Sequence, residues 1–200
     1  AAILADLDVQ LDGLIVASPS NPTGSMLTAE ALEEIVQWCD ATGVRLISDE
    51  IYHGITYGRK ASTALAYGDN AIIINSFSKY FSMTGWRLGW MIVPENLIRA
   101  AECLAQNIFI SPPTLSQLAT ISVFDCFEEL DANVARYAEN RALLLQALPK
   151  AGLDQLAPSD GAFYVYADVT RFTNDSQVFC QKVRAETGVA ITPCVDFDTE

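Results

Sequence analysis

Short runs of apolar residues in the first half of the chain predict β-strands. They cover residues 11–17, 44–48 and 71–75, and a further run of strand length covers residues 90–93. These runs are apolar at nearly every position, which is typical of strands in a sheet that is covered on both faces. A helical pattern separates the first two runs, so the sequence predicts an α/β fold with a mostly parallel sheet covered by helices.

Apolar residues at helical spacing predict the helices. The first stripe lies within residues 32–39 at i, i+3, i+4 and i+7, and Gly43 follows it as a helix-ending residue. Longer stripes lie within residues 97–108, 115–126 and 130–148. The chain therefore turns helical after its last predicted strand.

The last part of the chain combines a long helix with short elements. We expect a strand over residues 161–167, a helix over 176–187 and a short strand over 189–191. This change predicts two domains, a large one over residues 1–128 and a smaller α+β one over residues 129–200.

Charge and cysteine usage exclude several classes of function. The chain has 12 Lys and Arg against 25 Asp and Glu, a formal charge of −13, which argues against nucleic-acid binding and against a polybasic membrane contact. No apolar stretch reaches the length of a membrane span. The five cysteines are scattered and odd in number, which indicates reduced thiols and a cytoplasmic protein. Both ends look cut, so we expect a piece of a longer chain.

Polar residues follow each of the three predicted parallel strands. Asn21 follows the first strand, Asp49 the second and residues 76–79 the third. Ligands of open α/β sheets bind beyond the carboxyl ends of the strands. We therefore expect these three loops to meet at one rim.

Lys79 is the lysine of greatest chemical interest. It lies just beyond a very apolar strand, and a lysine that is partly desolvated near another cation becomes a nucleophile for carbonyls. Arg87, eight residues later, could supply that cation. Taken alone, Lys79 is better interpreted as a surface lysine that happens to follow a strand.

The neighbouring residue types favour a chemical role. Pyridoxal 5′-phosphate is the one ligand that needs all of these groups. Its aldehyde needs an amine and its pyridinium nitrogen a carboxylate, while its phenolate needs hydrogen-bond donors and its phosphate needs hydroxyls and a guanidinium. The residues that supply these groups are Lys79, Asp49, Tyr52, Asn21, Ser76, Ser78 and Arg87.

Three segments resemble the signature segments of the class I/II, fold-type I aminotransferases, and their order matches. The segments are Ser20-Asn21-Pro22-Thr23-Gly24, Asp49-Glu50-Ile51-Tyr52 and residues 76–90, with the sequence SFSKYFSMTGWRLGW. This resemblance implies a fold-type I transferase fold, with part of the large cofactor-binding domain and part of the smaller C-terminal domain.

The resemblance also implies the activity and a role for each site residue. Lys79 would form a Schiff base with pyridoxal 5′-phosphate and then move a proton, Asp49 would keep the ring nitrogen protonated, and Tyr52 and Asn21 would hydrogen-bond the ring oxygen. The reaction would transfer an amino group between an α-amino acid and a 2-oxo acid.

The phosphate group would be held by Ser76, Ser78 and Arg87. Of these, the Ser78 side chain could point away from the phosphate that Ser76 binds. Glu50 is expected to be a structural partner, and His53 is expected beside the site or at the surface. Gly161 and Phe163 resemble a small-domain strand near the substrate side.

Several alternatives stay open at this point. The same scaffold serves carbon–sulfur lyases and cyclopropane-forming synthases, and it also forms sensor domains of transcription regulators. No residue matches the substrate-carboxylate arginine of the family, and upstream parts of the site are missing. We therefore expect a homodimer of a longer chain, an exposed edge or apolar face on this fragment, and little activity from the fragment alone.

Overall fold

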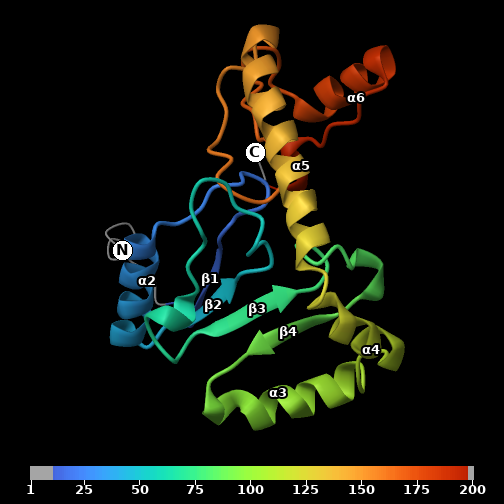
Figure 1. Cartoon of the computed structure of the whole chain (residues 1–200). Helices are drawn as coiled ribbons and strands as arrows, with labels where there is room; N and C mark the ends of the chain where they lie inside the picture. Colours follow the sequence, from blue (N-terminus) through green and yellow to red (C-terminus); the bar gives the residue numbers. More distant parts are fainter. Residues whose placement is uncertain (1–10, 198–200) are drawn as a thin grey trace.

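A four-stranded sheet forms the centre of the computed structural model, which describes residues 11–197. Its strands are β1 (Gly13–Ala17), β2 (Arg45–Asp49), β3 (Ile72–Ser76) and β4 (Gly89–Ile92), in the order β1-β2-β3-β4 (Figure 1). The first three strands are parallel and β4 is antiparallel to β3. The predicted α/β fold with a mostly parallel sheet is confirmed.

Helix α2 (Ala29–Thr42) covers one face of this sheet. It begins where the Thr28 hydroxyl accepts a hydrogen bond from the Ala31 amide at 3.1 Å, and it ends at Gly43 in the left-handed conformation (φ 74°). The predicted stripe of α2 packs on β2 and β3, and the core consists of Leu32, Ile35, Val36, Cys39, Val44, Leu46, Ala64, Ala71 and Ile73.

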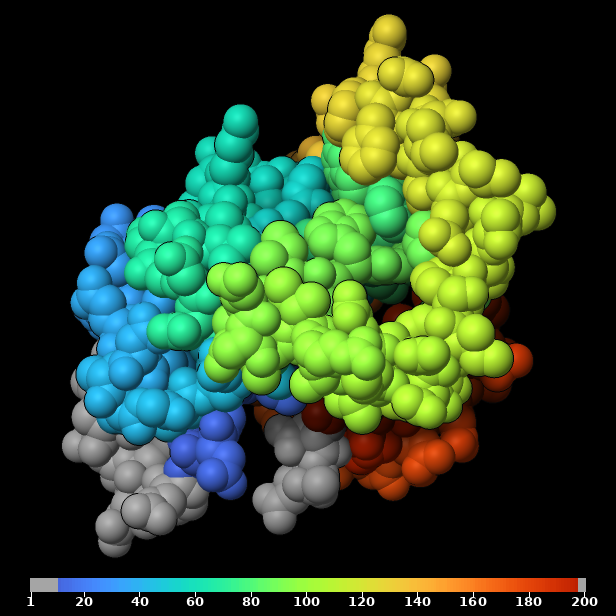
Figure 2. All heavy atoms as spheres, turned by 90° about the horizontal axis from the view of Figure 1, so that it is seen from below, coloured from blue at the N-terminus to red at the C-terminus, as the bar shows by residue number. Residues whose placement is uncertain are grey.

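The opposite side of the sheet is open in the described residues. All four residues of β4 are exposed, and the Ile15 side chain in β1 is 72% exposed. Helix α3 (Glu95–Ile108) has the predicted apolar stripe, yet Ile108 is 75% exposed; the helix spreads across this side of the molecule (Figure 2). The prediction of a sheet covered on both faces is therefore not met within residues 11–197, where this side of the sheet stays largely exposed. The expected exposed apolar face is present.

Three further helices follow, as the periodicity predicts. They are α4 (Thr114–Val123), α5 (Phe127–Ala147) and α6 (Ser176–Thr187), and the long α5 rises away from the sheet (Figure 1). Short 3₁₀ turns form at Ala64–Ala66, Thr84–Trp86, Pro149–Ala151 and Cys194–Asp196. The division into two domains at residue 128 stays a prediction.

Two predicted strands do not form. Residues 161–167 make only isolated bridges, Thr56 with Gly161 and Leu156 with Ala167, because Ala162 adopts a left-handed conformation (φ 57°) that interrupts an extended backbone. Residues 189–191 are irregular and largely exposed, with no ladder partner in the part of the chain that the structure describes.

The thiols and the helices agree with the exclusions made from composition. All five cysteines are free, as predicted. Between residues 11 and 197, no helix combines the length and the apolarity needed to cross a bilayer.

Candidate active site

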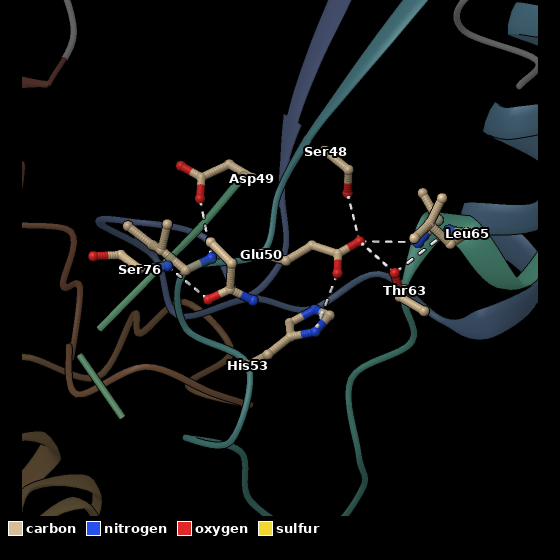
Figure 3. A network of polar contacts seen from close by, with 10 residues as sticks. Ser48, Asp49, Glu50, His53, Thr63, Leu65 and Ser76 are labelled. Atoms are coloured by element: carbon tan, nitrogen blue, oxygen red, sulfur yellow. Dashed lines mark hydrogen bonds and ion pairs between the residues drawn. The ribbon is translucent and has the colours of Figure 1, made fainter. Parts of the chain in front are cut away.

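The loops that follow β1, β2 and β3 begin at one edge of the sheet. The Ser18 amide donates to the Asp49 carbonyl at 3.2 Å, and the Glu50 amide donates to the Ile74 carbonyl at 2.9 Å. These bonds continue the parallel ladder past the strand ends, so the predicted meeting of the three loops is confirmed. Figure 3 shows Asp49 and Ser76 on neighbouring strands at this edge.

The amine of Lys79 lies against two aromatic rings. Its Nζ is 5.4 Å from the centre of the Tyr52 ring and 5.8 Å from the centre of the Phe163 ring. A cation over such rings is stabilised by their negative faces. Lys79 therefore faces the interior of the site, and the surface-lysine alternative is not what the structure shows.

Tyr52 is the buried ring beside the lysine amine. Its side chain is 2% exposed, and its hydroxyl hydrogen-bonds the hydroxyl of Tyr164. Burial raises the pKa of the Tyr52 phenol far above its usual range, and the nearby Asp49 carboxylate raises it further. Tyr52 thus stays protonated at neutral pH and can donate a hydrogen bond.

Asp49 keeps one carboxylate oxygen available. Its Oδ1 accepts a hydrogen bond from the Ile51 amide at 3.1 Å, and the side chain is half-buried. Among residues 11–197 no ion pair joins Asp49 to a cation. A half-buried carboxylate without a cationic partner favours a cationic ligand.

Hydroxyl groups and a guanidinium follow β3. The Ser76 hydroxyl donates to the Ser78 hydroxyl at 2.9 Å, and the Ser78 amide donates to Ser76 Oγ at 3.0 Å, so the two side chains face each other. Arg87 is exposed, in a left-handed conformation (φ 51°), and its Nη1 donates to the Thr84 carbonyl at 2.9 Å. The remaining donors of Arg87 suit an anion. That Arg87 supplies the cation near Lys79 stays a prediction.

Asn21 lies on a tight loop and is exposed. The loop closes on itself through the Ser20 amide, which donates to the Ser25 carbonyl at 2.9 Å, and the Gly24 amide, which donates to the Ser20 carbonyl at 2.8 Å. These backbone bonds fix the loop that carries Asn21, and within residues 11–197 its side-chain amide makes no hydrogen bond.

Comparison with known protein families identifies the family of this chain. The family described as "Aminotransferase class I and II" matches residues 1–199. The chain belongs to this family. The resemblance drawn from the three signature segments is therefore confirmed.

Individual relatives agree. A valine–pyruvate aminotransferase of Mycobacterium tuberculosis is 55% identical over 203 residues, which cover all of this chain and 52% of the relative. An aspartate/prephenate aminotransferase of Thermus thermophilus is 35% identical, over 92% of this chain and 49% of the relative. The chain thus spans about half the length of the curated relatives it matches.

Solved structures show the same fold. A crystal structure of an aminotransferase from Mycobacterium tuberculosis matches with a TM-score of 0.96 and 55% identity, over 99% of this chain and 52% of the other. Thermus thermophilus aspartate aminotransferase with maleate matches with a TM-score of 0.85 and 32% identity, over 93% of this chain and 50% of the other.

Glu50 has the structural role expected of it. Its Oε1 accepts hydrogen bonds from the Ser48 hydroxyl at 3.1 Å, the Thr63 hydroxyl at 3.0 Å and the Ala64 amide at 2.9 Å (Figure 3). Its Oε2 lies 3.4 Å from Nδ1 of His53. Glu50 ties the segment after β2 to the loop before the Ala64–Ala66 turn, and His53 lies beside it rather than at the rim.

Replacing Glu50 by Ala tests this role. We expect the free energy of unfolding to fall by about 3 kcal/mol, because three donors, two of them in buried hydrogen bonds, lose their acceptor. Urea unfolding of the purified protein measures the change. Glu186→Ala, at an exposed glutamate of α6, is the control and should change the value by less than about 0.5 kcal/mol. A loss for Glu50→Ala as small as that of the control would contradict the role.

The sequence prediction missed one residue of the site, Tyr164. Its hydroxyl reaches Tyr52 across 112 positions of the chain, and its ring meets the Tyr52 ring edge-on, with 5.6 Å between centres. The aromatic run after Gly161 was the signal, but alternation within a strand could not indicate which ring faces Tyr52.

Gly161 allows the Tyr164 segment to pack tightly on the site loops. A Cβ at this position would lie 2.5 Å from Pro19 Cγ and 2.9 Å from the Ile55 carbonyl oxygen. We expect Gly161→Ala to lower the free energy of unfolding by about 2 kcal/mol through overpacking, measured by urea unfolding. Gly85→Ala is the matched control, because a Cβ there meets no atom within 4 Å. Equal stability of the two variants would mean that the close approach is not a constraint.

Proposed function

We propose that the full-length protein is a pyridoxal 5′-phosphate-dependent transaminase that moves an amino group between an α-amino acid and a 2-oxo acid. The observation that carries the proposal is the placement of the Lys79 amine 5.4 Å from the centre of the buried Tyr52 ring, which lies three residues after Asp49. When bound, pyridoxal 5′-phosphate supplies an aldehyde carbon and a ring that accepts electrons.

The residues at the rim fit the ring of this cofactor. Lys79 would hold the aldehyde carbon and, once displaced by substrate, carry the proton to and from Cα. The free oxygen of Asp49 would accept a hydrogen bond from the protonated ring nitrogen. The protonated phenol of Tyr52 and the exposed amide of Asn21 would donate to the ring oxygen.

The residues after β3 fit the phosphate. Ser76 and Ser78 offer hydroxyls that already face each other, and Arg87 offers donors that no carboxylate in the described residues occupies. A guanidinium matches the geometry of a phosphate dianion. The structure therefore supports the inclusion of Ser78, which the sequence left least certain.

The name of one relative suggests which substrates to test first. The Mycobacterium tuberculosis relative, named a valine–pyruvate aminotransferase, is 55% identical over the whole of this chain. We propose valine and pyruvate as the first pair to test. We also propose a cytoplasmic homodimer, for which the free thiols and the exposed apolar face are the supporting features.

One experiment separates transamination from the alternatives. The full-length gene product is mixed with pyridoxal 5′-phosphate, reduced with borohydride, and digested. We expect a labelled peptide that contains Lys79, and we expect added valine to bleach the visible band without releasing ammonia. Ammonia release from the amino acid alone would indicate a lyase instead, and label on another lysine would sink the assignment. A band that no amino acid bleaches would favour a sensor domain.

A further inference from the structure

The segment around Tyr164 is attached by its backbone to two of the three site loops. The Gly161 amide donates to the Gly24 carbonyl at 2.9 Å, and the Ala162 amide donates to the Ile55 carbonyl at 2.9 Å. The Tyr57 hydroxyl also donates to the Ala162 carbonyl at 2.7 Å. Ala162 is fully buried, so this attachment does not depend on an exposed contact.

The same segment presents its two rings to the site. Phe163 lies 5.8 Å from the Lys79 amine, and Tyr164 places its hydroxyl on the hydroxyl of Tyr52. A phenol oxygen donates one hydrogen bond and accepts up to two. If Tyr164 donates to the Tyr52 oxygen, the Tyr52 proton is directed away from Tyr164 and is free for another acceptor.

We propose that Tyr164 is a positioning residue, whose hydroxyl donates to Tyr52 and thereby aims the Tyr52 proton at the ring oxygen of the cofactor. This inference rests on the proposed function, in which Tyr52 meets that oxygen. Tyr164 itself does not touch the reacting atoms. Its contribution is to fix the direction of one hydrogen bond, and the backbone bonds of Gly161 and Ala162 fix Tyr164 in turn.

The consequence is visible in the absorption of the bound cofactor. A hydrogen-bond donor at the ring oxygen stabilises negative charge on that oxygen. The Lys79 nitrogen, which would be bound to the aldehyde carbon next to it, then takes up a proton less readily. In Tyr164→Phe the ring contacts are kept and only the hydroxyl is lost, so the fold is preserved. The pH midpoint of the visible band should rise by about 0.5–1 pH unit, the range that one hydrogen bond supplies.

The test is a pH titration of four variants of the reconstituted full-length protein: Tyr52→Phe, Tyr164→Phe, the double variant, and Tyr166→Phe. Tyr166 is the matched control, because it lies two residues along the same segment. We expect the midpoint to rise in Tyr52→Phe and in Tyr164→Phe, and to stay unchanged in Tyr166→Phe. In the Tyr52→Phe background, the second substitution should add no shift, because the partner is already gone.

The outcomes distinguish the two proposals. A shift in Tyr52→Phe with none in Tyr164→Phe overturns the positioning role and leaves the proposed function standing. A Tyr164→Phe shift that persists in full in the Tyr52→Phe background also overturns it, because the effect would not pass through Tyr52. No shift in either single variant overturns the role of Tyr52 and the positioning role together.

Discussion

Lys79→Ala abolishes transamination by the full-length protein, with an expected loss of at least about 10⁴-fold in kcat, the upper range for a positioned proton-transfer group. The amine over Tyr52 and Phe163 is the group that the proposed function places at both the aldehyde carbon and the substrate proton. Stopped-flow absorbance of the half-reaction with valine measures the loss directly.

The control for this prediction is Lys60→Ala. Lys60 is an exposed lysine outside the site, so its removal should leave kcat within about two-fold of the unchanged protein. Borohydride labelling should disappear in Lys79→Ala and persist in Lys60→Ala. Activity that survives in Lys79→Ala would show that another amine serves the reaction.

The sequence predicts the elements whose signals are local. Helix α2 is an example, because its stripe and Gly43 each reflect contacts or backbone geometry within a few residues. The parallel strands are predicted for a similar reason, since short and continuously apolar runs such as residues 71–75 are typical of strands in a parallel sheet. Once the strands are parallel, the common edge for Asp49 and the residues after β3 follows from topology.

The failures of prediction concern long-range packing. The run at residues 161–167 has the composition of a strand, but its rings pack on Tyr52 and Lys79 while left-handed Ala162 breaks the extended backbone. Nothing near Tyr164 in sequence indicates a partner 112 residues away. The predicted covering of both faces of the sheet is likewise not met within residues 11–197, because apolar runs show that a face is apolar but not whether this chain covers it.

For the candidate site as well, the sequence indicates residue types but not their long-range packing. Residue types and order were enough to propose Asp49, Tyr52 and Lys79, since each carries a chemical group that pyridoxal 5′-phosphate would need. The sequence could not show that the Ser76 and Ser78 hydroxyls face each other. It could not show either that the Tyr52 ring lies beside the Lys79 amine, because that depends on how the loop after β2 folds over the rim.

Asp49→Asn should lower kcat by about 10²–10³-fold, the range for loss of one preorganised electrostatic group. The amide oxygen can still accept from the Ile51 amide, so the fold is kept while the negative charge is lost. The neutral side chain no longer favours a proton on the ring nitrogen, and the ring then accepts electrons less well. Steady-state kinetics should show the loss in kcat, with KM nearly unchanged.

Two matched variants separate charge from position in this prediction. Asp49→Glu keeps the charge and should retain more activity than Asp49→Asn, and Asp69→Asn removes an exposed carboxylate with no expected effect. Urea unfolding should place all three variants within about 1 kcal/mol of the unchanged protein, because Asp49 lacks the three-donor network of Glu50. If Asp49→Asn turned over as fast as Asp69→Asn, the carboxylate at the end of β2 would not be the group that sets the charge of the ring. The acid next to Glu50 would then be a second structural residue.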